Sequence, residues 1–135
     1  MKGIEEVRLL NFKEKGDERG QLVIVEGMKD IPFEIKRVFY MYGSEKGIIR
    51  GQHANKKSKF VLINISGNSK VKVDDGIRTK VYSLDRPYMG LYLPELVWKD
   101  MYDFSENSIL LVLSSEYYDS NEYIKSYDEF LKQVR

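Results

Sequence analysis

The chain has 135 residues, of which 42% are hydrophobic and 32% are charged, and its formal net charge is +1. These values are typical of a single globular domain spanning 1–135, and the balanced charge argues against a broad basic surface for nucleic acid. The absence of cysteine excludes disulfides and thiol chemistry. Because no apolar run approaches the length of a membrane span or of a signal-peptide core, we expect a cytoplasmic protein with no membrane partner.

Short segments with the composition of β-strands follow one another along most of the chain. Residues 13–20 are polar, contain two glycines and are predicted to form a loop. Asp74-Asp75-Gly76 lies between two alternating segments, and Asp-Gly in such a place is a strong hairpin signal. The predicted strands are 7–12, 21–26, 35–42, 48–54, 59–65, 69–73, 77–82, 89–93, 97–101 and 108–114. Many short strands separated by turns indicate an all-β sandwich or barrel.

The last part of the chain has a different pattern. From Asp119 onward the apolar residues recur with the helical period, and Glu122 follows Asp119 at the spacing of a capping box. The apolar positions are Tyr123, Ile124, Tyr127, Phe130, Leu131 and Val134. We therefore predict a C-terminal α-helix that begins near Asp119 and packs its apolar stripe on the sheet or on a partner subunit.

The one histidine of the chain, His53, lies between two strand-like segments, within the stretch 50–57. In an extended chain, His53 and Asn55 point to the same face of the strand, and we expect Arg50 on that face as well. An arginine, an imidazole and an amide on one face suit the wall of a pocket. From these residues alone, the alternatives are a half-exposed strand whose polar face meets water and a hydrogen-bonded core histidine.

Several short motifs, taken in their order and spacing, resemble one family. They are Asp17-Glu18-Arg19-Gly20, the stretch 31–40, Arg50-Gly51-Gln52-His53-Ala54, Gly90-Leu91-Tyr92, Val97-Trp98 and Ser115-Glu116-Tyr117-Tyr118-Asp119. Nearly end to end, the chain resembles the dTDP-4-keto-6-deoxyglucose 3,4-ketoisomerases, which are also described as WxcM-like cupins. The resemblance implies an antiparallel cupin (jelly-roll) barrel with a C-terminal α-helix, a homodimer, and an active site in the barrel mouth.

The resemblance also implies an activity. The substrate would be a dTDP-linked keto sugar, used for deoxyamino sugars of bacterial surface polysaccharides such as lipopolysaccharide and S-layer glycans. The isomerase moves a carbonyl from C4 to C3 through an enediol, so no redox cofactor is expected. Such a reaction needs a base that titrates near neutrality, a donor for the developing oxyanion and cations for the diphosphate.

Chemistry and resemblance together give each candidate residue an expected role. His53 is the expected base, because the unperturbed pKa of histidine is about 6.5. Family members carry a second histidine where this chain has Asn55, which cannot carry a proton but could orient the sugar or stabilise the enediolate. One imidazole could make both transfers if C3 and C4 present their protons on the same face. Tyr40 is the expected proton relay or oxyanion donor, and Arg19 and Arg50 are the expected diphosphate ligands.

Three further residues have open roles. Tyr92 and Trp98 could flank the pocket as substrate-binding residues or fill the barrel, and Lys99 could reach the site or point to solvent. No metal is expected, because one histidine with Asn55 makes a poor transition-metal ligand set. Two other functions are compatible with the motifs: a related isomerase or epimerase acting on another sugar nucleotide, and a non-catalytic cupin that binds a nucleotide sugar.

Overall fold

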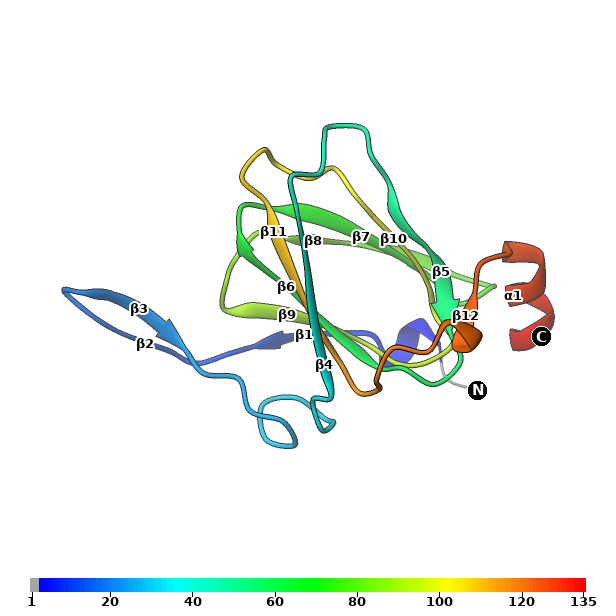
Figure 1. Cartoon of the computed structure of the whole chain (residues 1–135), viewed down its shortest axis with the longest axis horizontal. Helices are drawn as coiled ribbons and strands as arrows, with labels where there is room; N and C mark the ends of the chain where they lie inside the picture. Colours follow the sequence, from blue (N-terminus) through cyan, green and yellow to red (C-terminus); the bar gives the residue numbers. More distant parts are fainter. Residues whose placement is uncertain (1–2) are drawn as a thin grey trace.

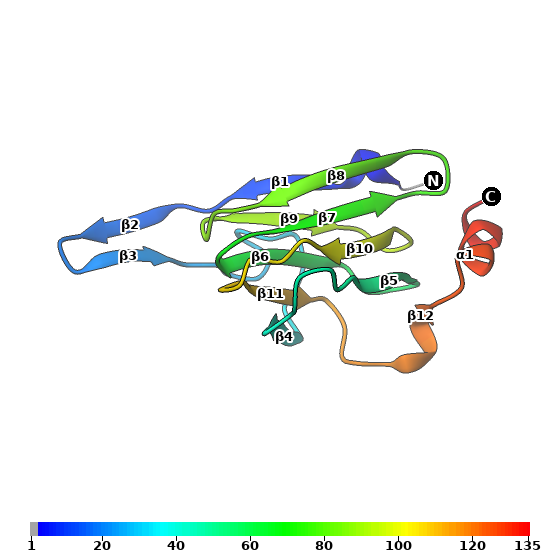
Figure 2. The same ribbon diagram turned by 90° about the horizontal axis from the view of Figure 1, so that it is seen from above.

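The fold is a barrel made of two five-stranded antiparallel sheets that face each other (Figure 1). The structure is a computed structural model, and it describes residues 3–135. Within these residues, one α-helix lies outside the barrel near the C-terminus, and a two-stranded hairpin projects from the opposite end (Figures 1 and 2). The predicted all-β jelly-roll barrel with a C-terminal helix is therefore confirmed.

Both sheets combine strands that are distant in the sequence. In order across the first sheet, the strands are β1 (Arg8–Asn11), β9 (Met89–Leu93), β6 (Phe60–Ser66), β11 (Ile109–Ser114) and β4 (Arg37–Tyr42). In the second sheet they are β12 (Tyr123–Ile124), β5 (Arg50–Asn55), β10 (Trp98–Tyr102), β7 (Ser69–Asp74) and β8 (Thr79–Leu84). The projecting hairpin consists of β2 (Glu14–Asp17) and β3 (Gly20–Val23), and the helices are η1 (Ile4–Glu6), η2 (Ser120–Glu122) and α1 (Tyr127–Val134). The predicted hairpin at 74–76 joins β7 to β8, with Asp74 opposite Thr79.

Strand β6 is buried on both of its faces, which is why its sequence is almost continuously apolar. Phe60 and Leu62 belong to the core between the two sheets, whereas Val61 and Ile63 belong to a second apolar cluster on the outer face of the first sheet. That outer cluster is covered by Phe12 and by residues of the connection between β3 and β4, which include Ile31 and Phe33. A strand buried on both faces loses the alternating pattern that a half-exposed strand shows.

The prediction of a loop at 13–20 is wrong, because residues 14–23 form the hairpin of β2 and β3. Every residue from 13 to 22 is exposed, so neither face of this hairpin carries the apolar alternation by which a strand is recognised in a sequence. Gly20, which has a φ of 127°, follows the turn. The strand predicted at 21–26 ends at Val23, where the chain leaves the hairpin.

The predicted start of the C-terminal helix is also wrong. Asp119 caps only the short helix η2, where its carboxylate accepts a hydrogen bond from the Asn121 amide at 3.0 Å. The two residues after η2, Tyr123 and Ile124, pair with β5 as strand β12. The helix α1 begins later, with Ser126 as its N-cap. Pairing with the sheet thus overrides the helical period at Tyr123. The helix packs on the outer face of the second sheet, as expected, with Phe130 buried against Trp98.

Candidate active site

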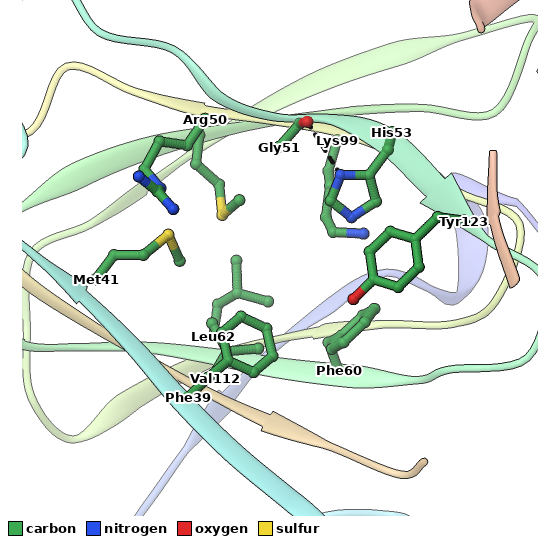
Figure 3. A pocket seen from close by; sticks show the side chains of 11 residues that line it. Phe39, Met41, Arg50, Gly51, His53, Phe60, Leu62, Lys99, Val112 and Tyr123 are labelled. Carbon is green, nitrogen blue, oxygen red and sulfur yellow. Dashed lines mark hydrogen bonds between the residues drawn. The ribbon is translucent and has the colours of Figure 1, made fainter. Parts of the chain in front are cut away.

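A cavity of about 110 Å³ lies between the two sheets, inside the barrel (Figure 3). It is lined by Phe39, Met41, Arg50, Gly51, His53, Phe60, Leu62, Lys99, Met101, Val112 and Tyr123. His53, Lys99 and Tyr123 lie together on one side, and Arg50 lies apart from them beside Met41. Within residues 3–135, no three histidine, aspartate or glutamate side chains are grouped so that they could hold a metal ion. Most of the wall is apolar, so the few polar groups act in surroundings that exclude water.

A β-bulge brings Arg50 and His53 to the same face. These residues are three positions apart, so a regular strand would point them in opposite directions. In the pairing of β5 with β10, His53 lies opposite Lys99 and Gly51 lies opposite Asp100, which leaves Gln52 as an extra residue. Gly51 and Gln52 have φ values of 87° and 54°. The expectation that Arg50 shares the His53 face is met by this bulge and not by an extended strand.

Gly51 is required at the bulge by its surroundings as well as by its backbone angle. A Cβ atom at this position would lie 2.9 Å from the carbonyl oxygen of Lys99 and 3.0 Å from Cε of Met101. Any other residue would push β5 away from β10 or strain the backbone. The glycine therefore sets the distance between the two strands that carry His53 and Lys99.

The bulge also fixes the protonation of the His53 ring. Nδ1 of His53 lies 3.0 Å from the carbonyl oxygen of Gly51, as the dashed line in Figure 3 marks. A carbonyl only accepts hydrogen bonds, so Nδ1 carries the proton and the other nitrogen, Nε2, has a free lone pair. Burial and, after it, the positive charge of Lys99 together lower the pKa of His53 to about 4. The imidazole is thus neutral at pH 7, with Nε2 unprotonated, and its pKa lies below the near-neutral range that the sequence reasoning expected of the base.

Asn55 lies behind the cavity wall, in a buried network of hydrogen bonds. Its Nδ2 donates to Oε1 of Glu122 at 2.7 Å, and its Oδ1 accepts from Nζ of Lys99 at 3.1 Å. The backbone amide and the hydroxyl of Ser58 also donate to the Glu122 carboxylate, at 3.1 and 2.9 Å. A carboxylate only accepts, so the orientation of the amide is fixed. Asn55 is not among the residues that line the cavity, and its expected role toward the sugar stays a prediction.

Lys99 lies on the inward face of β10 and lines the cavity, where it is only 5% exposed. Its Nζ is 4.5 Å from the centre of the Phe60 ring. Burial lowers the pKa of Lys99 to about 7, with Arg37 acting in the same direction, while the negative charge of Glu122 opposes the shift. Both the amine and the ammonium form are therefore populated near neutrality, which an exposed lysine does not allow.

The cavity also contains a tyrosine that the sequence reasoning missed. The ring of Tyr123, on β12, lies tilted by 45° against that of His53 with 4.8 Å between the ring centres, and its hydroxyl accepts a hydrogen bond from Nη1 of Arg37 at 3.3 Å. Nη2 of Arg37 donates to the hydroxyl of Ser114 at 3.2 Å, which orients the guanidinium. In the sequence, Tyr123 fits the helical stripe and is one of ten tyrosines, so no local signal separates it from the others.

Tyr40 does not lie beside His53 within one subunit. Phe39 and Met41 of β4 line the cavity, and alternation along the strand therefore sends Tyr40 to the opposite face. There it is 60% exposed and stacks on Tyr42, with the ring centres 6.3 Å apart. The expected role of Tyr40 as a relay within its own subunit is not supported by this position.

Three other candidates also lie outside the cavity. Trp98 points away from Lys99 and packs under α1, and Tyr92 lies in the outer cluster of the first sheet beside Phe33, so both contribute to packing. Arg19 lies on the projecting hairpin, where its side chain is 85% exposed and paired with Asp17 at 2.6 Å. Of the predicted site residues, His53 and Lys99 lie together in the cavity, Arg50 lines it at some distance from them, and Asn55 lies behind the wall.

Comparison with known proteins agrees with this fold. The model of the family "FdtA: WxcM-like, C-terminal" matches residues 5–135. A TDP-4-oxo-6-deoxy-alpha-D-glucose-3,4-oxoisomerase of Aneurinibacillus thermoaerophilus is 43% identical over 129 residues, which are 96% of this chain and 93% of that protein. The crystal structure of a 3,4-ketoisomerase from Helicobacter canadensis is 43% identical, with a TM-score of 0.93 and coverage of 96% and 97% of the two chains.

A third relative is a histidine-to-asparagine mutant of the 3,4-ketoisomerase QdtA from Thermoanaerobacterium thermosaccharolyticum, in complex with TDP-4-keto-6-deoxyglucose. It is 43% identical, with a TM-score of 0.93 and coverage of 95% of this chain and 93% of that chain. The barrel of two facing antiparallel sheets, with a cavity lined by one imidazole and two cationic side chains, has the architecture of a cupin. The chain belongs to the FdtA, or WxcM-like C-terminal, family.

The buried Lys99 predicts a stability that increases with pH above neutrality. Between its folded pKa of about 7 and its ordinary value of 10.5, the unfolded chain binds a proton that the folded chain does not. The free energy of unfolding therefore rises with pH in this window, and the full penalty is present below it. We expect urea titrations to show that, relative to Lys99→Met, the wild type gains about 2–3 kcal/mol between about pH 7 and about pH 9.5. A pH-independent difference would contradict the burial of the charge.

Proposed function

We propose that this chain is a sugar-nucleotide 3,4-ketoisomerase that converts a dTDP-linked 4-keto-6-deoxyhexose to its 3-keto isomer. The relatives named as 3,4-oxoisomerase and 3,4-ketoisomerase are each 43% identical to it and match it over nearly the whole chain. The observation that carries the proposal is the neutral His53 imidazole in the cavity, with its Nδ1 proton held by Gly51 and its Nε2 unprotonated. The product would supply deoxyamino-sugar synthesis for surface glycans.

The reaction needs a base at carbon and no external oxidant. Nε2 of His53 takes the proton from C3, the C3–H electrons form a C3=C4 double bond, and the carbonyl electrons move to O4, which takes a proton. The resulting enediol then loses the O3 proton, C3=O3 forms, and the imidazolium returns a proton to C4. The net change moves one hydrogen from C3 to C4 and one from O3 to O4, so atoms and electrons balance within the sugar.

The cavity offers suitable partners for the rest of the substrate. Arg50 is exposed where it lines the cavity, so its guanidinium is available for the phosphate oxygens of a diphosphate. The hydroxyl of Tyr123, already hydrogen-bonded by Arg37, lies beside the imidazole and can donate to an enediolate oxygen. The QdtA mutant forms a complex with the keto sugar although one of its histidines is replaced by asparagine. In that relative, an asparagine in place of one histidine is thus compatible with binding of the keto sugar.

A homodimer is the second part of the proposal. Strand β4 is an edge of the first sheet, and its outer face exposes Val38, Tyr40 and Tyr42 by 52%, 60% and 72%. An exposed edge strand with apolar side chains is a surface that proteins normally cover. A second copy of the chain would cover it. Arg19 lies on the hairpin that projects away from the barrel, so its expected contact with the diphosphate would be made in the cavity of that second subunit.

Exchange of the sugar protons tests the base directly. With dTDP-4-keto-6-deoxyglucose in deuterated water, we expect proton NMR to show exchange at C3 and C4 with the wild type. His53→Asn should slow this exchange by about 10²–10⁴-fold, because no second imidazole is present. Lys57→Gln, on the exposed turn after β5, serves as a control that keeps the wild-type rate. Wild-type exchange in His53→Asn would remove the imidazole from the mechanism.

Titration of dTDP tests the diphosphate contact. Arg50→Ala should weaken binding by about ten- to a hundredfold, which is the expected effect of losing one charge-assisted contact. Lys46→Ala in the exposed loop before β5 removes the same charge without touching the cavity and should leave the affinity unchanged. Equal affinity of Arg50→Ala and the wild type would exclude Arg50 from the binding site.

Sedimentation velocity tests the assembly. The wild type should sediment as a dimer at micromolar concentration, and Tyr40→Asp should shift it toward the monomer, because the charge would be buried in the contact. Lys80→Asp on the exposed edge strand β8 of the other sheet serves as the control. A monomeric wild type would refute the dimer.

A further inference from the structure

Lys99 is buried, and its hydrogen-bond partner is a neutral amide. A lysine that only provided a positive charge would need neither feature. Lys99 lies directly opposite His53 in the register of β10 and β5, and both side chains line the same cavity. Its hydrogen-bond partner is the neutral amide oxygen of Asn55, at 3.1 Å, and this amide stands between the lysine and the buried carboxylate of Glu122. The lysine is thus held in place by a group that carries no charge.

The amide spacer has a specific chemical consequence. A carboxylate in direct contact would hold the lysine in its ammonium form. The oxygen of Asn55 accepts a hydrogen bond from an ammonium and from a neutral amine alike, so Nζ keeps its position in both protonation states. In the amine form, one N–H binds Asn55 and the lone pair is left free. The Glu122 carboxylate, by accepting from Nδ2, prevents the amide from turning around.

The proposed reaction leaves a proton transfer without an assigned group. One hydrogen moves between carbons and another between oxygens, but His53 has a single free nitrogen, because its Nδ1 proton is bound to Gly51. Arg50, the other cation lining the cavity, does not release its proton near neutrality. Lys99 is the cavity-lining cation that burial brings to a pKa of about 7. It is therefore suited both to give and to take a proton.

We propose that Lys99 is the second acid–base residue of the site and carries the proton between the two sugar oxygens, while His53 serves the carbons. The proposal rests on the ketoisomerase function and deepens it. In the forward direction, the Lys99 ammonium gives a proton to O4 as the C3–H bond breaks. The resulting amine then takes the proton from O3 as C3=O3 forms, which restores the ammonium. The lysine is unchanged after the cycle, so no co-reactant is consumed.

The pH dependence of this step depends on all charged groups that face Lys99. They are His53 and Arg50 from β5, Arg37 from β4, Tyr123 from β12, and Glu122 from η2. His53 is neutral above about pH 4 and is a constant partner near neutrality. A kinetic transition near pH 7 in the wild type is accordingly expected to belong to Lys99.

Kinetics of three variants test the proposal. Lys99→Arg keeps the charge but does not release its proton near neutrality, and Lys99→Met replaces the lysine by an unbranched, uncharged side chain that is one atom shorter. Both should lower kcat for 3,4-isomerisation by about 10²–10³-fold, and in Lys99→Arg the transition near pH 7 should disappear while dTDP affinity stays within about threefold of the wild type. Lys72→Met is the control: Lys72 lies on the neighbouring strand β7 and alternates with Val71 and Val73, which face the core, so it should keep wild-type kinetics.

Chemical rescue separates a titrating amine from a structural role. The chain has no cysteine, so Lys99→Cys provides a single thiol, which is alkylated in denaturant with bromoethylamine and refolded. The product has a terminal amine at the length of lysine and should recover activity, whereas alkylation with iodoacetamide gives a neutral amide and should not. Thermal melting and dTDP binding show that each protein is folded.

The outcomes are distinguishable. A wild type that shows neither exchange nor isomerisation refutes the ketoisomerase function, and the role of Lys99 with it. An active wild type with Lys99→Arg within about threefold of its kcat overturns the role of Lys99 alone. That role is also overturned if Lys99→Arg loses dTDP binding in proportion to its rate, or if both alkylated proteins have equal activity. An active wild type with a slow, dTDP-binding Lys99→Arg and selective rescue by the amine supports the proposal.

Discussion

The buried carboxylate of Glu122 is the interaction on which the site depends. An ionised group inside a protein is costly unless hydrogen bonds replace its water. Here the amide of Asn55 and the backbone amide and hydroxyl of Ser58 provide those bonds. They tie the end of the chain to β5 and, through Asn55, to Lys99 on β10. The same attachment brings Tyr123, the next residue after Glu122, into the cavity beside His53. Hydrogen bonds to the Glu122 carboxylate therefore bring together one side of the cavity from three separate parts of the sequence, which are β5, β10 and the segment of η2 and β12.

The bulge in β5 is the second constraint, and it joins backbone geometry to chemistry. Without the extra residue Gln52, Arg50 and His53 would face opposite sides of the sheet. The carbonyl of Gly51, turned by the positive φ of the bulge, is the group that fixes the His53 tautomer. The conformation that places the imidazole in the cavity thus also decides which of its nitrogens is the base.

Some of the fold could be predicted because its signals are local. The apolar strand at 59–65, the hairpin at 74–76 and the histidine-containing strand each carry their pattern within a few residues. The hairpin at 14–23 could not be recognised, because its exposed strands bury no face and so show no alternation. The helix was predicted too early, because Tyr123 and Ile124 satisfy a helical stripe but are claimed by a long-range pairing with β5.

The site was predictable in part for the same reason. His53, Arg50 and Lys99 lie within or next to short motifs that the family resemblance includes, whereas choosing among the tyrosines required knowing which face of β4 is inside. Both faces of that strand are apolar: Phe39 and Met41 point inward, and Tyr40 and Tyr42 point outward. The alternation of the strand was clear from the sequence, but which of the two sets of side chains points inward was not. The buried network could not be foreseen either, because Glu122 and Asn55 are 67 residues apart in the chain.

Through Asn55, this network holds Lys99 at the point where its nitrogen both gives and takes a proton near neutrality. The direct measurement is a ¹³C NMR titration of the full-length protein labelled at lysine Cε, with the Lys99 signal assigned by its absence from Lys99→Met. The account predicts a titration midpoint near 7 for Lys99, while exposed lysines titrate at about 10.4. A Lys99 signal that stays in the ammonium form to above about pH 9 would contradict it, because the lysine would then serve as a fixed charge.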